Sequence, residues 1–206
     1  MLNSFAAAGV AMSMLAPAVP ADVPVVPPPG EKITVDVLTV NGSGCPAGTA
    51  DVIESPDNTG FRIYYDNYLA RNGGSSAPTD FRKNCQIGLK VHVPQGYSYS
   101  ITKVDYRGYA RLGDGSHALQ RANYYFQGDS ANNYQDHVLD GPLSGSWRTT
   151  DFTADENLVW SPCGEDRNLN INTELRVYGD GANWINMSST GGKIYTVYEF
   201  SWKTCP

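Results

Sequence analysis

The sequence predicts an all-β protein, an antiparallel β-sandwich of the jelly-roll-like or Greek-key kind, stapled by two disulfide bonds. Apolar and polar residues alternate with a period of two along most of the chain after residue 33, and no 3.6-residue period persists there. The 21 glycines and 13 prolines supply frequent turns between these runs. The 13 tyrosines and 4 tryptophans among 206 residues enrich the chain in aromatic side chains, which favour strands.

The N-terminal segment predicts export, with a secreted, extracellular location. A short apolar run covers residues 5–15, and alanines follow it as at a signal-peptidase site. The run is too short to span a bilayer. No Lys or Arg precedes it, so a disordered Ala-rich tail is the alternative. We expect a signal peptide at 1–21, a poorly packed proline-rich spacer at 22–32 and a single β-sandwich domain at 33–206.

The alternating runs predict the strands in order. They cover 33–40, 50–55, 60–66, 86–93, 97–112, 122–127, 168–177 and 194–203, with a short apolar run at 158–160. Within 97–112 the apolar positions change from odd to even numbers, which predicts a bulge or bend near Lys103. The stretch 137–147 mixes apolar residues with Gly and Pro, and we assign no strand to it.

Charge and spacing exclude several classes of ligand. The formal net charge is -6, so we expect neither nucleic acid nor an anionic membrane surface as a partner, because both need a positive footprint. The four cysteines contain no Cys-x-x-Cys, and the three histidines are scattered, so the sequence predicts no metal site. No cofactor is expected. The oligomeric state is left open.

The four cysteines predict two disulfide bonds in an exported chain. If the runs 168–177 and 194–203 pair as antiparallel neighbours, Cys205 faces a position near 166, about three residues from Cys163 and close enough to bridge. This favours Cys163–Cys205 and leaves Cys45–Cys85. Each bond closes a loop of about 40 residues, worth about 4 kcal/mol in the chain-entropy description.

Cys85 follows Arg82 and Lys83, and positive neighbours lower the pKa of a thiol. A reactive cysteine would also need a poised histidine and a reducing compartment, and the sequence shows neither. We therefore expect Cys85 to be a structural cysteine at the start of a core strand, with Arg82 and Lys83 as solvated charges.

Several segments together resemble a known family. In chain order they are GSGCPAGTA, DFRKNCQIGLKVHVPQG, VDYRGYARL, YYFQG, LVWSPCG, RNLNINTELRV and FSWKTC. They resemble a family of secreted, mainly fungal and bacterial proteins catalogued as domain of unknown function 4360, from about Asn41 to Cys205. The resemblance implies secretion and structural cysteines, and it carries over no activity, cofactor or catalytic residue.

Two rows of polar side chains are expected to face away from the core, and they form the candidate ligand surface. Such rows combine amides and charges, which meet sugar hydroxyls, with an aromatic ring, which stacks on the apolar face of a sugar. The alternative is an ordinary solvated sheet face. The rows are Asp105, Arg107, Tyr109 and Arg111, and Asn168, Asn170, Asn172, Glu174 and Arg176.

Catalysis and calcium binding have weaker support. Glycoside hydrolysis needs two carboxylates facing each other, and Glu165 and Asp166 beside Cys163 are the best-placed pair, although turn residues are the simpler interpretation. No established hydrolase motif is present, and no catalytic residue is assigned. Oxygen-rich side chains that suit calcium occur at Asp151, Asp155 and Glu156, and in the loop 129–133, without the spacing of an EF-hand.

Asn41 and Asn186 begin N-glycosylation sequons, which matter only in a eukaryotic source. Taken together, the sequence favours an exported, non-catalytic β-sandwich that acts at a cell surface, wall or host interface. The expected partner is a cell-wall or host glycan, or a surface protein. The alternatives are a secreted polysaccharide-active hydrolase and a structural secreted protein without a small ligand.

Overall fold

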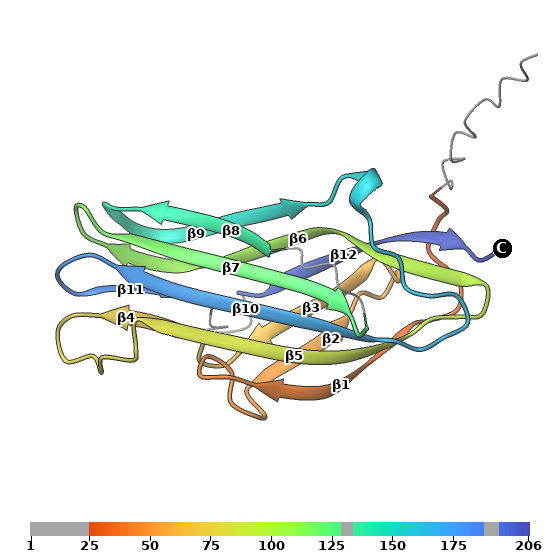
Figure 1. Ribbon diagram of the computed structural model, residues 1–206, viewed down its shortest axis with the longest axis horizontal. Helices are drawn as coiled ribbons and strands as arrows, with labels where there is room; N and C mark the ends of the chain where they lie inside the picture. The colour runs from red at the N-terminus through yellow and green to blue at the C-terminus, as the bar shows by residue number, and fades with distance from the viewer. Residues whose placement is uncertain (1–24, 129–133, 188–193) are drawn as a thin grey trace, which may run out of the picture.

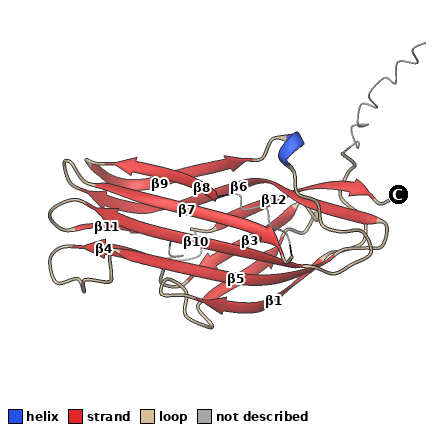
Figure 2. Ribbon diagram, viewed as in Figure 1, coloured by secondary structure: helices blue, strands red, loops and turns tan. Residues whose placement is uncertain are grey.

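The computed structural model describes residues 25–128, 134–187 and 194–206. The described chain forms two antiparallel β-sheets packed face to face, with one short 3-10 helix at Asp155–Asn157 (Figure 1; Figure 2). The predicted all-β sandwich is therefore confirmed. The predicted signal peptide at 1–21 and the oxygen-rich loop at 129–133 lie outside the described residues.

One sheet has five strands in the order β1-β5-β10-β7-β8. Their bounds are β1 Thr34–Asn41, β5 Arg82–His92, β10 Asn168–Tyr178, β7 His117–Phe126 and β8 Tyr134–Asp140. The central strand β10 alternates buried odd-numbered residues, including Leu169, Ile171 and Val177, with half-buried polar ones. One face of this sheet therefore belongs to the core and the other faces solvent.

The second sheet has seven strands, in the order β2-β3-β12-β6-β11-β4, with β9 on the other edge of β6. Their bounds are β2 Ala50–Glu54, β3 Gly60–Tyr65, β12 Thr196–Thr204, β6 Tyr97–Leu112, β11 Asn183–Asn186, β4 Leu69–Asn72 and β9 Leu143–Phe152. The 16-residue β6 is long enough to pair with β12 along one half and with β11 along the other.

Aromatic rings join the two sheets in the core. Tyr99 on β6 contacts Phe126 on β7 edge to face, with 5.4 Å between ring centroids. It also lies 4.6 Å from Phe200 on β12. Burial raises the pKa of Tyr198 well above its usual range, so this hydroxyl stays protonated at all ordinary pH values. The many tyrosines of the sequence thus serve largely as core residues.

The bulge predicted near Lys103 is confirmed. On β12 the consecutive residues Glu199 and Phe200 pair with Lys103 and Ile101, so Thr102 is the extra residue of β6. This changes which face of the strand is buried, as the phase change in the sequence indicated. The inward positions of β5, among them Ile87, Leu89 and Val91, are also buried as predicted.

The sequence patterns did not predict β4, β8, β9 or β11. β4 and β11 have four residues each, which is too short for a periodic signal. β8 exposes Tyr134 and Val138, so its apolar residues do not mark one buried face. β9 contains only Leu143, Trp147 and Phe152 as large apolar residues.

The predicted pairing of 168–177 with 194–203 is wrong. β10 pairs with β5 and β7 in one sheet, whereas β12 pairs with β3 and β6 in the other. The segment between them is not a hairpin turn, because it contains β11, which pairs with β4 and β6. The chain thus passes from one sheet to the other between these two strands.

Both predicted disulfide bonds are nevertheless present, with Cα–Cα distances of 5.2 Å for Cys45–Cys85 and 5.8 Å for Cys163–Cys205. The second forms for a different reason from the one expected. The Ser161 backbone N–H donates to the Tyr99 carbonyl of β6 (2.8 Å), and the Cys205 N–H donates to the Gly96 carbonyl (2.7 Å). The start of β6 therefore brings the two cysteines together.

The described part of the proline-rich segment packs against the domain, contrary to our expectation of a poorly packed spacer. Val26 forms an isolated antiparallel bridge with Trp202 of β12. The Asn58 side-chain amide donates to the Pro29 and Glu31 carbonyls, each at 2.8 Å. This buried asparagine therefore fastens the segment to the edge of the seven-stranded sheet.

Candidate functional site

The structure places the two candidate rows on opposite outer faces of the sandwich. Asp105, Arg107, Tyr109 and Arg111 lie on β6 of the seven-stranded sheet. The row from Asn168 to Arg176 lies on β10 of the five-stranded sheet. One ligand on one face cannot contact both rows, so we describe them as separate surfaces.

Asp105 is buried rather than exposed, contrary to prediction, with 3% of its surface accessible. Arg148 on β9 forms a two-pronged pair with it at 3.1 and 2.8 Å, and the Thr150 hydroxyl donates at 2.6 Å. Burial alone would raise the pKa of Asp105, but the hydrogen bonds from Arg148, Thr150 and Lys103 outweigh it and lower the pKa to about 2. Asp105 is thus an ionised structural residue.

Arg107 is committed to an aromatic contact. Its guanidinium carbon lies 5.1 Å from the ring centroid of Tyr195, and that of Arg62 on β3 lies 5.3 Å from the same ring. The Tyr64 ring lies 5.5 Å from Tyr195. Cation–π contacts of this kind hold the rings and guanidinium groups in place.

Tyr109 and Arg111 remain available to a ligand. Tyr109 is 48% exposed, and its backbone N–H donates to the side-chain oxygen of Asn186 at 3.0 Å. Arg111 is exposed and pairs with Trp184 across the β6–β11 ladder. Trp184 is the diagonal cross-strand neighbour of Tyr109 on the same face of the sheet. Aromatic side chains in such diagonal positions can reach each other.

The exposed serines of β9 complete this surface. Ser146 is opposite Tyr109, and Ser144 is opposite Arg111. We name the group the Tyr109 surface; it consists of Tyr109, Arg111, Ser144, Ser146 and Trp184. It combines two aromatic rings with hydroxyl and guanidinium hydrogen-bonding groups.

The Tyr109 surface continues into a shallow hollow of about 420 Å³. The hollow is bordered by the turns that precede β9 and β11, and its polar lining includes Arg111, Ser144, Asp180 and Asn183. The backbone N–H of Gly113 donates to the Asn183 side chain at 2.7 Å, which fixes the end of β6 against the β11 turn. An extended ligand that lies along the aromatic rings could thus reach into this polar hollow.

The β10 row is divided between amides and an ion-pair network. Asn168, Asn170 and Asn172 are half-buried. Glu174 is 7% exposed, which contradicts its expected place on an open face, and it pairs with Arg176 and with Arg82 on β5. Arg82 is therefore not merely a solvated charge.

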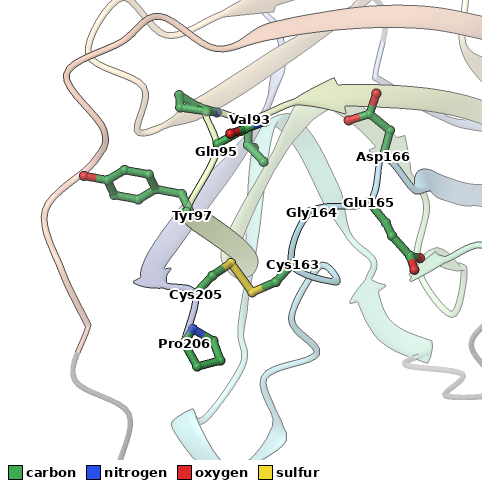
Figure 3. Close-up of a pocket in the computed structure, with 11 residues that line it drawn as sticks. Val93, Gln95, Tyr97, Cys163, Gly164, Glu165, Asp166, Cys205 and Pro206 are labelled. Atoms are coloured by element: carbon green, nitrogen blue, oxygen red, sulfur yellow. A yellow bond between two sulfur atoms is a disulfide. The ribbon is translucent and has the colours of Figure 1, made fainter.

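A hollow of about 620 Å³ lies at the Cys163–Cys205 end of the sandwich (Figure 3). Figure 3 shows the carboxylates of Glu165 and Asp166 pointing in different directions. Asp166 pairs with Lys90 (3.1 Å) and His92 (3.3 Å), whereas Glu165 pairs with Arg167. The two do not face each other across a cleft, as a glycosidase pair would.

The proposed calcium ligands are also not brought together. Asp151 lies in the core side of β9, where it accepts from the Tyr106 hydroxyl (2.9 Å) and contacts His137 Nε2 (2.5 Å). Asp155 and Glu156 are in the exposed 3-10 turn. Among the described residues, no three His, Cys, Asp or Glu side chains are grouped as for a metal ion.

The two sequons differ in accessibility. Asn41 is exposed at the end of β1, whereas Asn186 is half-buried in β11 with its side-chain oxygen bonded to Tyr109. Asn41 remains the better candidate for a modified residue. Ser188 of the second sequon lies outside the described residues.

Sequence patterns missed the most useful neighbours of the candidate rows. Trp184 lies in a four-residue strand that the sequence offered only as part of a loop. Arg148 lies in β9, which has too few apolar residues to mark its faces. A tryptophan within an otherwise polar loop sequence was the one available signal for Trp184.

Comparisons with known proteins found a similar sequence and a similar solved structure. An uncharacterized secreted protein of Arthroderma benhamiae is 30% identical over 181 residues, which cover 86% of this chain and 74% of that protein. A solved structure, TmCBM61 in complex with β-1,4-galactotriose, is 9% identical and aligns with 84% of this chain and 88% of that chain, with a TM-score of 0.28.

The described residues contain no helix long and apolar enough to cross a membrane. Residues 31–205 match the family described as a domain of unknown function, DUF4360. This span includes both disulfide bonds, both candidate rows and the Tyr109 surface. The chain therefore belongs to the DUF4360 family.

Proposed function

We propose that this protein is an exported, non-catalytic module that binds a glycan of a cell wall or cell surface through the Tyr109 surface. Export is supported by the predicted signal peptide at 1–21, by two disulfide bonds and by the relative described as secreted. The predicted domain limits, 33–206, would make the sandwich one binding unit.

The aromatic pair of exposed Tyr109 and half-buried Trp184 carries the proposal. Exposed rings are costly in water, and a sugar ring can cover them with its apolar face while its hydroxyls reach neighbouring donors and acceptors. Ser144, Ser146 and Arg111 supply such groups on the adjacent positions of the same face. The backbone of this site is a sheet of three paired strands, which holds the rings in place without a ligand.

The test is retention on insoluble polysaccharide. The purified protein is incubated with insoluble β-glucan and with chitin, and the bound fraction is measured as a function of protein concentration. The expected result is saturable binding to at least one of them, with Tyr109→Ala and Trp184→Ala each weakening it about fivefold or more, because loss of a stacked ring costs about 1 kcal/mol or more.

Phe81→Ala is the matched control, because Phe81 is 40% exposed but directly precedes β5 of the other sheet. It should bind β-glucan or chitin like the parent protein. Unchanged binding of the Tyr109→Ala and Trp184→Ala variants would exclude this surface. A glycan array without any bound sugar would favour the structural secreted protein, and release of soluble sugar from the polysaccharide would favour the hydrolase.

A further inference from the structure

A second surface with different chemistry lies on the outer face of the five-stranded sheet. Three arginines from three neighbouring strands surround the carboxylate of Glu174: Arg82 on β5, Arg176 on β10 and Arg121 on β7. Arg82 is opposite Arg176 in the β5–β10 ladder, and Arg121 is opposite Glu174 in the β7–β10 ladder. We name these four residues the arginine cluster.

The arginine cluster has an excess of positive charge. Glu174 pairs with Arg82 and Arg176, and Asp136 on β8 pairs with Arg121 through two hydrogen bonds of 2.6 Å. Three guanidinium groups therefore meet two carboxylates. One positive charge is unbalanced at this place, on a protein whose formal net charge is -6.

The guanidinium groups also keep free donors. Arg82 uses Nε and Nη2 on Glu174, and Arg121 uses Nε and Nη2 on Asp136. Arg176 uses Nε on Glu174 and Nη1 on the Tyr178 hydroxyl. Each arginine thus retains one terminal nitrogen without a partner among the described residues, and each such nitrogen carries two N–H donors.

A hollow of about 230 Å³ lies over the arginine cluster. The three arginines and Glu174 line it, together with the amides of Asn84, Gln86 and Asn172 and the ring of Tyr134. Arg121 lies over the Tyr134 ring, 5.8 Å from its centroid, and that ring is 59% exposed. Charged guanidinium groups, neutral amides and an aromatic ring thus line one small hollow.

We infer that this hollow binds an acidic sugar, with the carboxylate of a uronic acid on the free guanidinium nitrogens. Arginine matches a carboxylate through paired, charge-assisted hydrogen bonds. The amides of Asn84, Gln86 and Asn172 suit the sugar hydroxyls, and Tyr134 suits an apolar sugar face. A single unbalanced positive charge matches a monoanionic carboxylate better than a phosphate dianion.

This inference goes beyond the Tyr109 surface and does not depend on it, since the two surfaces lie on opposite faces of the sandwich. A protein molecule with both binding surfaces would hold two polysaccharide chains at once. It would therefore link an acidic polysaccharide to a neutral one.

The test compares polygalacturonate with its fully methyl-esterified form, because the two share a backbone and differ in the charge of the carboxyl group. Binding is measured by affinity electrophoresis in gels that contain either polymer. The expected result is retardation by polygalacturonate at least tenfold stronger than by the ester, and weaker retardation as salt is raised. Equal retardation by the two polymers would overturn the inference.

Arg121→Gln is the first variant, because its partner Asp136 is 43% exposed and tolerates the loss. Arg176→Gln is the second, because it removes the excess positive charge while Glu174 keeps its pair with Arg82. Each should lower affinity for polygalacturonate about tenfold or more. Circular dichroism and thermal unfolding establish that each variant is folded.

Arg167→Gln is the matched control, since Arg167 is 42% exposed at the disulfide end, away from the arginine cluster. It should bind polygalacturonate like the parent protein. An equal loss in Arg167→Gln, or full binding by both cluster variants, would overturn the assignment. Equal competition by dextran sulfate, charge for charge, would exclude a carboxylate site.

Tyr109→Ala separates this inference from the proposed function. It should keep its affinity for polygalacturonate while losing affinity for β-glucan or chitin. Loss of both affinities would contradict the separation of the two surfaces.

Discussion

The two disulfide bonds close loops of nearly equal length in opposite surroundings. Their sequence separations are 40 and 42, so chain entropy predicts about the same stabilisation for each, roughly 4 kcal/mol. Cys45 and Cys85 are 0% and 1% exposed and belong to the hydrophobic core. Cys163 is exposed and Cys205 half-buried, and both line the 620 Å³ hollow.

The difference shows that one kind of covalent bond has two structural roles here. The Cys45–Cys85 bond is packed like a core side chain, and the buried Gly44 beside it leaves space for the Tyr68 ring. The Cys163–Cys205 bond acts as a tether between a surface loop and the last strand. Four predictions test this contrast, from the largest expected effect to the smallest.

Selective reduction should give the largest difference. A mild thiol reductant in the absence of denaturant should open Cys163–Cys205 and leave Cys45–Cys85 intact, because thiolate attack requires access to a sulfur atom. Alkylation followed by peptide mass spectrometry would identify the reduced pair. If Cys85 were alkylated in the native protein before Cys163, this result would contradict the contrast between the two bonds.

Replacing each pair should separate core packing from chain entropy. Cys163→Ala with Cys205→Ala should lower the free energy of unfolding by about 4 kcal/mol. Cys45→Ala with Cys85→Ala should cost at least about 1 kcal/mol more, because it also removes buried contacts. Urea unfolding measures both, and equal losses would mean that burial adds nothing to the first bond.

Two glycines beside the disulfide bonds provide a smaller, matched test. In Gly44→Ala the new Cβ would lie 2.2 Å from a ring carbon of Tyr68, so we expect a loss of about 2 kcal/mol or more. In Gly164→Ala nothing lies within 4 Å, and the positive φ of 72° leaves only backbone strain of about 1 kcal/mol. A larger loss in Gly164→Ala would reverse the contrast.

Replacing Asp80 should give the smallest effect. Asp80 lies just before β5, the strand that contains Cys85, and its carboxylate makes stability depend on pH. Hydrogen bonds from the Lys83 side chain, the Ala77 backbone N–H and Arg71 lower the pKa of Asp80 from 3.8 to about 2. A carboxylate with a lowered pKa stabilises the fold above its unfolded pKa and loses that contribution as pH falls.

Asp80→Asn should therefore unfold more easily than the parent protein at pH 6, and this difference should vanish between about pH 4 and pH 2. Thermal unfolding at several pH values measures it. A difference that persists at pH 2 would assign the effect to hydrogen bonding of the side chain rather than to its charge.

The amino-acid pattern was sufficient for elements that depend on local burial. The alternation around Ile87, Leu89 and Val91 predicted β5, and the change of phase near Lys103 predicted the bulge at Thr102. It was insufficient for β8, where Tyr134 and Val138 are exposed and the alternate positions are only half-buried. Short edge strands likewise give no periodic signal, because too few residues alternate.

The candidate rows show the same limit. Tyr109 and Arg111 are on an outer face as predicted, but Asp105 and Glu174 point outward and are still buried. Arg148 covers Asp105 and Arg82 covers Glu174 from neighbouring strands. The two-residue alternation along a strand predicts which face of the sheet a side chain occupies. Only the neighbouring strand determines which side chains cover it.

The sequence by itself determined the fold class and the strands with strong alternation, because alternation depends on the chain alone. It also led to the correct cysteine pairs, but Cys163–Cys205 was predicted from a strand pairing that the structure does not have. Strand neighbours were decided by the tertiary structure, since β10 and β12 follow each other closely in sequence yet lie in different sheets. Only that arrangement placed Trp184 beside Tyr109 and gathered three arginines around Glu174. Contacts between distant segments make these sites, and no local pattern records such contacts.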